Sequence, residues 1–246
     1  MRYYAEEAER LARTTDKALM AGFCFSSFGD IALVPAPWLK RPRGIRDIEE
    51  WYISTLTRRD YIYKVFERQC EVALDNLARL AQAVGDRIQV TLVTGTDFGA
   101  QNAPFIAPQT YRDLYQPFHR AVNSWVHEHT RWKTFIHSCG SVAELIPEFI
   151  ASGFDILNPV QTAAAGMDPR VLKERFGERL VFWGGGVDTQ RLLPFGTPAQ
   201  IRAQVRERME VLGRDGGFVF AAIHNIQAGV PAENLLALFE AVREYR

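Results

Sequence analysis

The chain has 246 residues, 47% of them hydrophobic, and it carries 29 basic and 29 acidic side chains. This length suits a single α/β domain, and the zero net charge argues against broad binding to nucleic acid or to an acidic membrane surface. Three cysteines are too few for a disulfide framework. Residues 1–15 do not resemble a signal peptide, and no apolar run is long enough to cross a bilayer. We therefore expect a cytoplasmic enzyme or binding domain.

Strands and helices are predicted to alternate along the chain. Apolar runs in this sequence tend to be apolar throughout, as in parallel sheets that are covered on both faces. From residue 17 onward six strands are each followed by a helix, which predicts an α/β protein, either a (β/α) barrel or a doubly wound sheet. In chain order the pattern predicts a helix at 3–14, a strand at 17–25, helices at 47–52 and 59–84, a strand at 87–93, a helix at 109–129, a strand at 133–137, a strand at 154–160, a helix at 168–176, a strand at 180–183, a helix at 199–212, a strand at 217–223 and a helix at 232–244.

Three local features complete this prediction. Residues 26–46 form a long loop rich in glycine and proline, for which a functional role and a merely irregular connection are equally plausible. Ser141 and Glu144 have the spacing of a capping box, although Pro147 predicts either a kink in that helix or a later start. The histidines of the 109–129 helix are expected at the surface or at helix ends, because none has a metal-binding companion nearby in sequence: His119, His127 and His129.

Polar side chains recur where the predicted strands end. In a barrel all strand ends of one kind open on a single face, where the active site forms. No glycine-rich nucleotide-binding fingerprint is present, since the glycine run at 184–186 lacks the required spacing. We expect these residues to share one face of the sheet: Asp97, His137, Cys139, Asn158, Gln161, Asp188 and His224.

His137 and Cys139 stand two residues apart where a short apolar strand breaks at a Ser-Cys-Gly sequence. Residues at this spacing in an extended segment point to the same side, so an imidazole and a thiolate would converge. Zinc takes nitrogen and sulfur ligands of this kind. By itself, however, the pair more often represents a buried cysteine beside a hydrogen-bonded histidine.

Six segments give the chain a specific resemblance. They are TDFGAQ at 96–101, FIAPQTYRDLYQP at 105–117, IHSCGSV at 136–142, GFDILNPVQ at 153–161, GG…D at 185–188 and HNIQAGVPAEN at 224–234. In this order the segments resemble the uroporphyrinogen decarboxylase superfamily, and within it the cobalamin-dependent methyltransferases. The resemblance implies a (β/α)8 barrel and a zinc ion bound by His-x-Cys and a later cysteine. The zinc would activate a group that exchanges a methyl with a corrinoid.

The chain departs from this family pattern in two ways. His224 stands where the methyltransferases have the later cysteine, when Pro231 to Asn234 is used as the anchor; the decarboxylases also carry histidine there. Zinc accepts either ligand, and one thiolate fewer would leave a stronger Lewis acid that favours an ether or hydroxyl oxygen over a thiol. The six predicted strands also fall short of eight, so we expect an incomplete barrel in a single domain, 1–246.

The resemblance implies a role for each candidate residue. Zinc would be held by His137, Cys139 and His224, while Asp97, His137 and His224 would take part in catalysis, with a corrinoid carried by a partner protein. The implied substrate-binding residues are Gln101, Asn158, Gln161, Asp188 and Asn225. Two of these have local alternatives: Asp188 could cap the following loop, and Asn225 could close a turn.

Two other functions remain open on the sequence. One is a metal-free decarboxylase of an acidic tetrapyrrole, in which the His-x-Cys pair would have no role. The other is a non-catalytic, incomplete homologue. The missing strands favour this last alternative and also predict unpaired edges that promote a homodimer.

Overall fold

The computed structural model describes residues 1–22 and 26–245, so Cys24 and the end of the first predicted strand lie outside the described residues. The chain divides into two compact units. The first comprises Met1–Asp97, Phe105–His137 and Glu144–Asp155, and the second comprises Phe98–Pro104, Ser138–Ala143 and Ile156–Arg246. No helix formed by the described residues is long and apolar enough to span a membrane.

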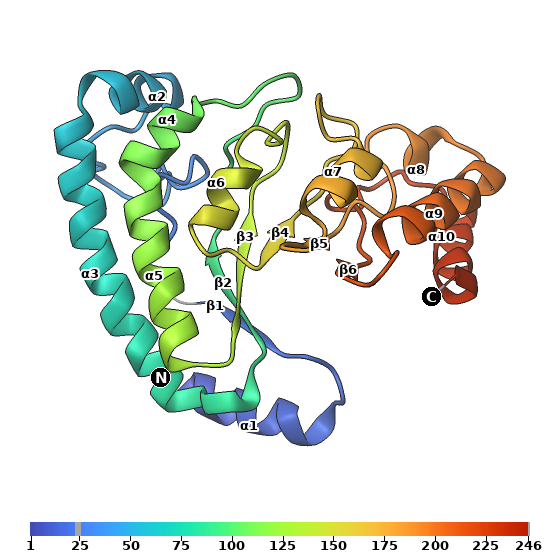
Figure 1. Cartoon of the computed structure of the whole chain (residues 1–246), viewed down its shortest axis with the longest axis horizontal. Helices are drawn as coiled ribbons and strands as arrows, with labels where there is room; N and C mark the ends of the chain where they lie inside the picture. Colours follow the sequence, from blue (N-terminus) through green and yellow to red (C-terminus); the bar gives the residue numbers. More distant parts are fainter. Residues whose placement is uncertain (23–25, 246) are drawn as a thin grey trace. The chain divides into compact units, whose positions relative to one another are not determined.

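Helices and strands alternate in both units (Figure 1). The first unit contains α1 (Arg2–Thr14), β1 (Met20–Gly22), α2 (Ile48–Thr57), α3 (Arg59–Val84), η1 (Gly85–Arg87), β2 (Val90–Thr94), α4 (Pro108–Thr110), η2 (Tyr111–Tyr115), α5 (Gln116–His129), β3 (Lys133–His137) and α6 (Ile146–Ala151). The second contains β4 (Ile156–Asn158), α7 (Pro169–Phe176), β5 (Val181–Trp183), α8 (Leu192–Phe195), α9 (Pro198–Leu212), β6 (Phe218–Val219) and α10 (Ala232–Tyr245).

The strands of the described chain are parallel and follow the order β1-β2-β3-β4-β5-β6. In the first unit β2 pairs with β1 and with β3, and in the second β5 pairs with β4 and with β6. Four of the five residues of β2 are buried, as expected for a strand that is covered on both faces. The predicted α/β class and its six parallel strands are therefore confirmed.

The last strand is shorter than predicted. The apolar run 217–223 predicts seven strand residues, but only Phe218 and Val219 have regular strand geometry. Pairing continues irregularly beyond them, because the Gly186 N–H donates to the Ala221 carbonyl at 2.9 Å. The run therefore stays beside the residues that follow β5, although its backbone leaves the regular ladder.

The helix predicted at 109–129 is interrupted by the π-helical turn η2. The Gln116 N–H bonds to the Tyr111 carbonyl, five residues earlier. The next residue, Pro117, has no N–H to offer the helix ladder, which explains why the register changes here.

The capping box predicted at Ser141 does not form. α6 begins only at Ile146, after Leu145, and has no side-chain cap. The Ser141 hydroxyl instead donates to the Ala165 carbonyl at 2.7 Å. Pro147 occupies the first turn of α6, where a missing N–H costs nothing, so the alternative of a later helix start is confirmed.

The core of the first unit is an aromatic cluster around α3 and α5, which lie side by side in Figure 1. The Phe66 ring packs 5.5 Å from Phe28 and 5.3 Å from Tyr115, measured between ring centroids. His119 belongs to this core, so the prediction that it lies at the surface or at a helix end is wrong. It is fully buried, and its Nδ1 is 2.8 Å from the Tyr111 hydroxyl. Burial makes the neutral ring favourable and lowers its pKa to about 3.

The core of the second unit lies between α9 and α10. Ile201 and Val205 of α9 pack with Ala237, Leu238 and Ala241 of α10, and all five are buried. These positions recur at helical spacing, which explains why both helices could be predicted from the sequence.

Candidate metal centre

Asp97 and His137 follow two paired parallel strands of the first unit. His137 is the last residue of β3, and Asp97 follows the end of β2 at Thr94. Hydroxyl groups hold the intervening turn: Thr96 Oγ1 lies 2.8 Å from Thr94 Oγ1 and donates to the Phe28 carbonyl at 2.9 Å. Asp97 Oδ1 and His137 Nε2 are 3.9 Å apart. The expectation that these two side chains share one end of the sheet is confirmed.

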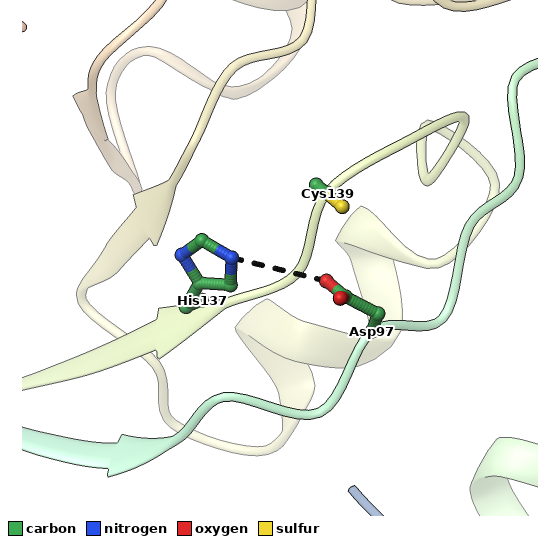
Figure 2. A group of neighbouring side chains, drawn as sticks. All are labelled: Asp97, His137 and Cys139. Carbon is green, nitrogen blue, oxygen red and sulfur yellow. Dashed lines mark ion pairs between the residues drawn. The ribbon is translucent and has the colours of Figure 1, made fainter. Parts of the chain in front are cut away.

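Cys139 joins them to make a group of three potential metal ligands. One ligand atom each of Asp97, His137 and Cys139 lies within 4.8 Å of the others (Figure 2). The side chains of Asp97 and His137 are 27% and 30% exposed, so solvent and small molecules can reach them. A carboxylate, an imidazole and a thiolate are all ligands that zinc accepts, and this donor set therefore fits a zinc ion.

The backbone around Cys139 packs closely against residues 98–104. Gly140 has a φ of +85°, and a Cβ atom there would lie 2.3 Å from the Gly99 carbonyl oxygen. A Cβ on Gly99 would in turn lie 2.7 Å from the carbonyl oxygen of Cys139. The Ser141 N–H donates to the Ala100 carbonyl at 2.8 Å. Only glycine permits this approach, which sets the position of the cysteine.

A further hydrogen bond explains why residues distant in sequence meet here. The Phe98 N–H donates to Ser138 Oγ at 2.9 Å, and both groups are buried. Phe98 directly follows Asp97, and Ser138 directly follows His137. The bond therefore holds together the two chain segments that carry the carboxylate and the imidazole.

Gln101 and Gln161 link the cysteine loop to its neighbours within the second unit. Gln161 Oε1 accepts from the Gly140 N–H at 2.8 Å, and its Nε2 donates to Gln101 Oε1 at 3.1 Å. Gln101 Nε2 donates to the Ala163 carbonyl at 2.6 Å. Both side chains thus have a positioning role, and their predicted contact with substrate stays a prediction.

Asn158 and Asp188 also make bonds within the protein. Asn158 Nδ2 donates to the Trp183 carbonyl at 3.0 Å, which links the ends of β4 and β5. Asp188 Oδ1 accepts from the backbone N–H groups of Gln190 at 2.7 Å and Arg191 at 3.2 Å. Asp188 therefore caps the loop that follows it, one of its two expected roles. Substrate binding by these two residues stays a prediction.

His224 and Asn225 are exposed residues of the segment that follows β6. The three-residue ligand group found in the described part of the chain contains Asp97, not His224. The convergence of His224 with Cys139 stays a prediction, as does contact of Asn225 with substrate. Sequence reasoning placed Asp97 among the catalytic residues but did not identify it as a potential metal ligand.

Two further residues beside this group were not identified from the sequence. Asp30 lies in the loop after β1, and its pKa is raised, chiefly by burial. The Ala32 N–H opposes this rise, the Asp97 charge adds to it, and His137 opposes it. Tyr52 of α2 donates from its hydroxyl to the Asp97 backbone carbonyl at 3.4 Å. Burial, followed by the charges of Asp97 and Asp30, raises the pKa of this hydroxyl. The one available signal was the long loop at 26–46, which contains Asp30.

Comparison with known proteins relates the chain to one family. The family model described as uroporphyrinogen decarboxylase (URO-D) matches residues 1–245. A search of curated proteins gives no match. Among solved structures, a methyltransferase from Methanosarcina mazei is similar, with a TM-score of 0.64 and 17% sequence identity over 98% of this chain. The matched part is 64% of that methyltransferase chain, and at this identity the likeness concerns the fold alone.

Proposed function

Because the chain belongs to the uroporphyrinogen decarboxylase family, whose fold is a (β/α) barrel, we propose that it takes part in methyl transfer. The methyl group would pass between a small methylated ether or thiol and a corrinoid carried by a partner protein. The observation that carries this proposal is the convergence of Asp97, His137 and Cys139. The fold likeness to a methyltransferase supports it.

We assign the zinc site to His137 and Cys139, with Asp97 or His224 as the third ligand, so that a fourth position stays open for the substrate atom. When bound, zinc supplies a Lewis acid that polarises the oxygen or sulfur carrying the methyl group. To bind metal, the cysteine must be a thiolate and the histidine neutral, so binding releases protons. The Tyr52 hydroxyl holds the Asp97 backbone, and the Gln161 amide holds the Gly140 N–H next to Cys139. These contacts pre-position the ligands.

The zinc content of the protein purified without chelator tests this proposal. We expect about one zinc per chain, and loss of that zinc in Cys139→Ser and in His137→Ala, because each removes a ligand. Cys70→Ala is the matched control. Cys70 is buried in α3, and burial raises its pKa to about 11, so it remains a thiol and should not contribute. A wild-type protein without zinc would remove the physical basis of the proposal.

The role of His224 has its own test. If His224 is a ligand, His224→Ala loses zinc with little loss of stability, because the residue is exposed and carries little core packing. His224→Cys keeps zinc and shifts the preference toward thiol substrates, since it adds a second thiolate. Retention of full zinc in His224→Ala would leave Asp97 as the only third ligand.

A metal-free decarboxylase acting on an acidic tetrapyrrole is the second candidate, favoured by the description of the matching family. A decarboxylase of this kind would not require the Cys139 thiolate. On this alternative Cys139→Ser retains full activity, and carbon dioxide is released from the tetrapyrrole without added metal. The same variant therefore separates the two functions.

A further inference from the structure

A cavity of about 250 Å³ lies within the first unit, between the long loop that follows β1, the start of α2 and the first half of α3. Its volume is near the lower end of the range for ligand pockets, so any occupant is a small molecule. Most of the wall is apolar and comes from Leu33, Val34, Ile45, Val65 and Phe66. An apolar body therefore fits most of this space.

One residue of the wall, Gln69, carries a polar atom without a partner. Gln69 Oε1 is buried and accepts no hydrogen bond from any described residue. A buried carbonyl oxygen that is left unpaired costs free energy, and native structures rarely tolerate one without a partner such as a ligand or a water. An N–H or O–H group on the occupant would satisfy this atom.

The charged groups of the wall favour an anion. Arg43 and Arg46 both line the cavity, and neither forms an ion pair with a carboxylate of the described chain. The Arg46 guanidinium donates to the carbonyls of Arg43 at 2.7 Å and Val34 at 3.1 Å, whereas the exposed Arg43 guanidinium makes no such bond to the described residues. The one acid in the wall is Asp30, whose Oδ1 already accepts from a backbone N–H at 2.9 Å. Two positive groups thus face one negative group.

We propose that this cavity is a binding site for a small carboxylic acid that has an apolar body and one O–H or N–H donor. The carboxylate pairs with Arg43, the apolar body lies against Leu33 and Val65, and the donor bonds to Gln69 Oε1. All these residues belong to the first unit. Binding requires no metal, so this proposal goes beyond the methyl-transfer function and can fail or succeed independently of it.

Isothermal titration calorimetry with three matched probes tests the proposal on the metal-free and the zinc-loaded protein. Para-hydroxyphenylacetate has all three features, phenylacetate lacks the hydroxyl donor, and para-hydroxyphenylacetamide lacks the negative charge. We expect the first to bind most tightly, with about fivefold weaker binding for the second and about tenfold or more for the third, as lost neutral and charged hydrogen bonds predict. The order should be the same with and without zinc.

Variants assign each preference to one side chain. Gln69→Leu should bind para-hydroxyphenylacetate and phenylacetate equally. Arg43→Gln should bind para-hydroxyphenylacetate and para-hydroxyphenylacetamide equally. Arg41→Gln is the matched control, because Arg41 lies in the same loop but does not line the cavity. Val65→Trp should fill the cavity and abolish binding of all three probes.

Three results would overturn the proposal. The first is absence of binding of para-hydroxyphenylacetate to the wild-type protein at millimolar concentration. The second is unchanged preferences in both Gln69→Leu and Arg43→Gln. The third is unchanged binding to a folded Val65→Trp protein. None of these results depends on zinc content or on methyl transfer, so failure here leaves the proposed function to be judged by its own test.

Discussion

Gly140 sets how closely the cysteine loop approaches residues 98–104. We expect Gly140→Ala to destabilise the protein by about 2 kcal/mol or more, because its Cβ would lie 2.3 Å from a backbone oxygen that cannot move cheaply. Gly216→Ala is the matched control: its φ of +81° is similar to the +85° of Gly140, but nothing lies within 4 Å of its Cβ. Gly216→Ala should therefore be destabilised by the backbone strain alone, about 1 kcal/mol.

Urea unfolding of the two glycine variants measures this difference, and zinc analysis shows whether the Cys139 ligand has moved. We expect that only Gly140→Ala also loses metal, because only there would the added Cβ displace the loop that carries Cys139. Equal destabilisation of the two variants would show that the packing against Gly99 is not tight.

His119 links a single buried residue to the pH dependence of stability. Its pKa is about 3 in the folded state against 6.5 ordinarily, so below pH 6.5 the unfolded chain takes up a proton that the folded chain does not. Stability contributed by this group is therefore complete above about pH 6.5 and is lost as the pH falls toward 3. Between about pH 7.5 and pH 5 the loss is about 2 kcal/mol.

His119→Gln should remove this dependence while allowing a hydrogen bond to Tyr111. As the pH falls over the same interval, the free energy of unfolding of the variant should decrease by about 2 kcal/mol less than that of the wild type, measured by urea unfolding. His129→Gln, at an exposed position on the same helix, is the control and should follow the wild type. If the free energy of unfolding depends on pH in the same way for the wild type and His119→Gln, His119 is not the source of this dependence.

At the scale of elements, the N-terminus of α9 is set by hydrogen bonds between residues close in sequence. Thr197 Oγ1 accepts from the Gln200 N–H, and the Gln200 side chain accepts from the Thr197 N–H, which forms a complete capping box. We expect Thr197→Ala to lower the free energy of unfolding by about 1 kcal/mol. Thr197→Ser keeps the hydroxyl and should lose much less. If thermal unfolding gives the same loss for both variants, the methyl group rather than the cap is responsible.

The elements also show which boundaries the sequence can predict. α3 was predicted at 59–84 and is found at those residues, because a long buried stripe ends at a glycine. The capping box predicted before α6 is wrong, because the Ser141 hydroxyl bonds to Ala165, 24 residues away, and not to the helix. A capping pattern competes with distant acceptors that the sequence does not reveal.

At the scale of the whole molecule, we expect self-association. Several large apolar side chains are exposed, among them Phe195, Leu236 and Phe239 of the second unit, and each is more than half exposed. Leu236 and Phe239 stand three residues apart on α10 and so share one face of that helix, and exposed apolar surface of this kind promotes association. Light scattering at increasing concentration should show species larger than a monomer, and Leu236→Lys together with Phe239→Lys should reduce them. A wild-type protein that stays monomeric at high concentration would contradict this expectation.

The sequence by itself determined the α/β class, the parallel strands and the His-x-Cys pair. These depend on interactions between near neighbours: the period of apolar residues, and the shared direction of residues two apart in an extended segment. Only the tertiary structure decided that Asp97 joins His137 and Cys139. That meeting depends on the Phe98 to Ser138 hydrogen bond and on the Gly99–Gly140 approach, between residues about 40 positions apart. The burial of His119 and the unpaired Gln69 oxygen have the same origin, because both depend on how distant elements pack.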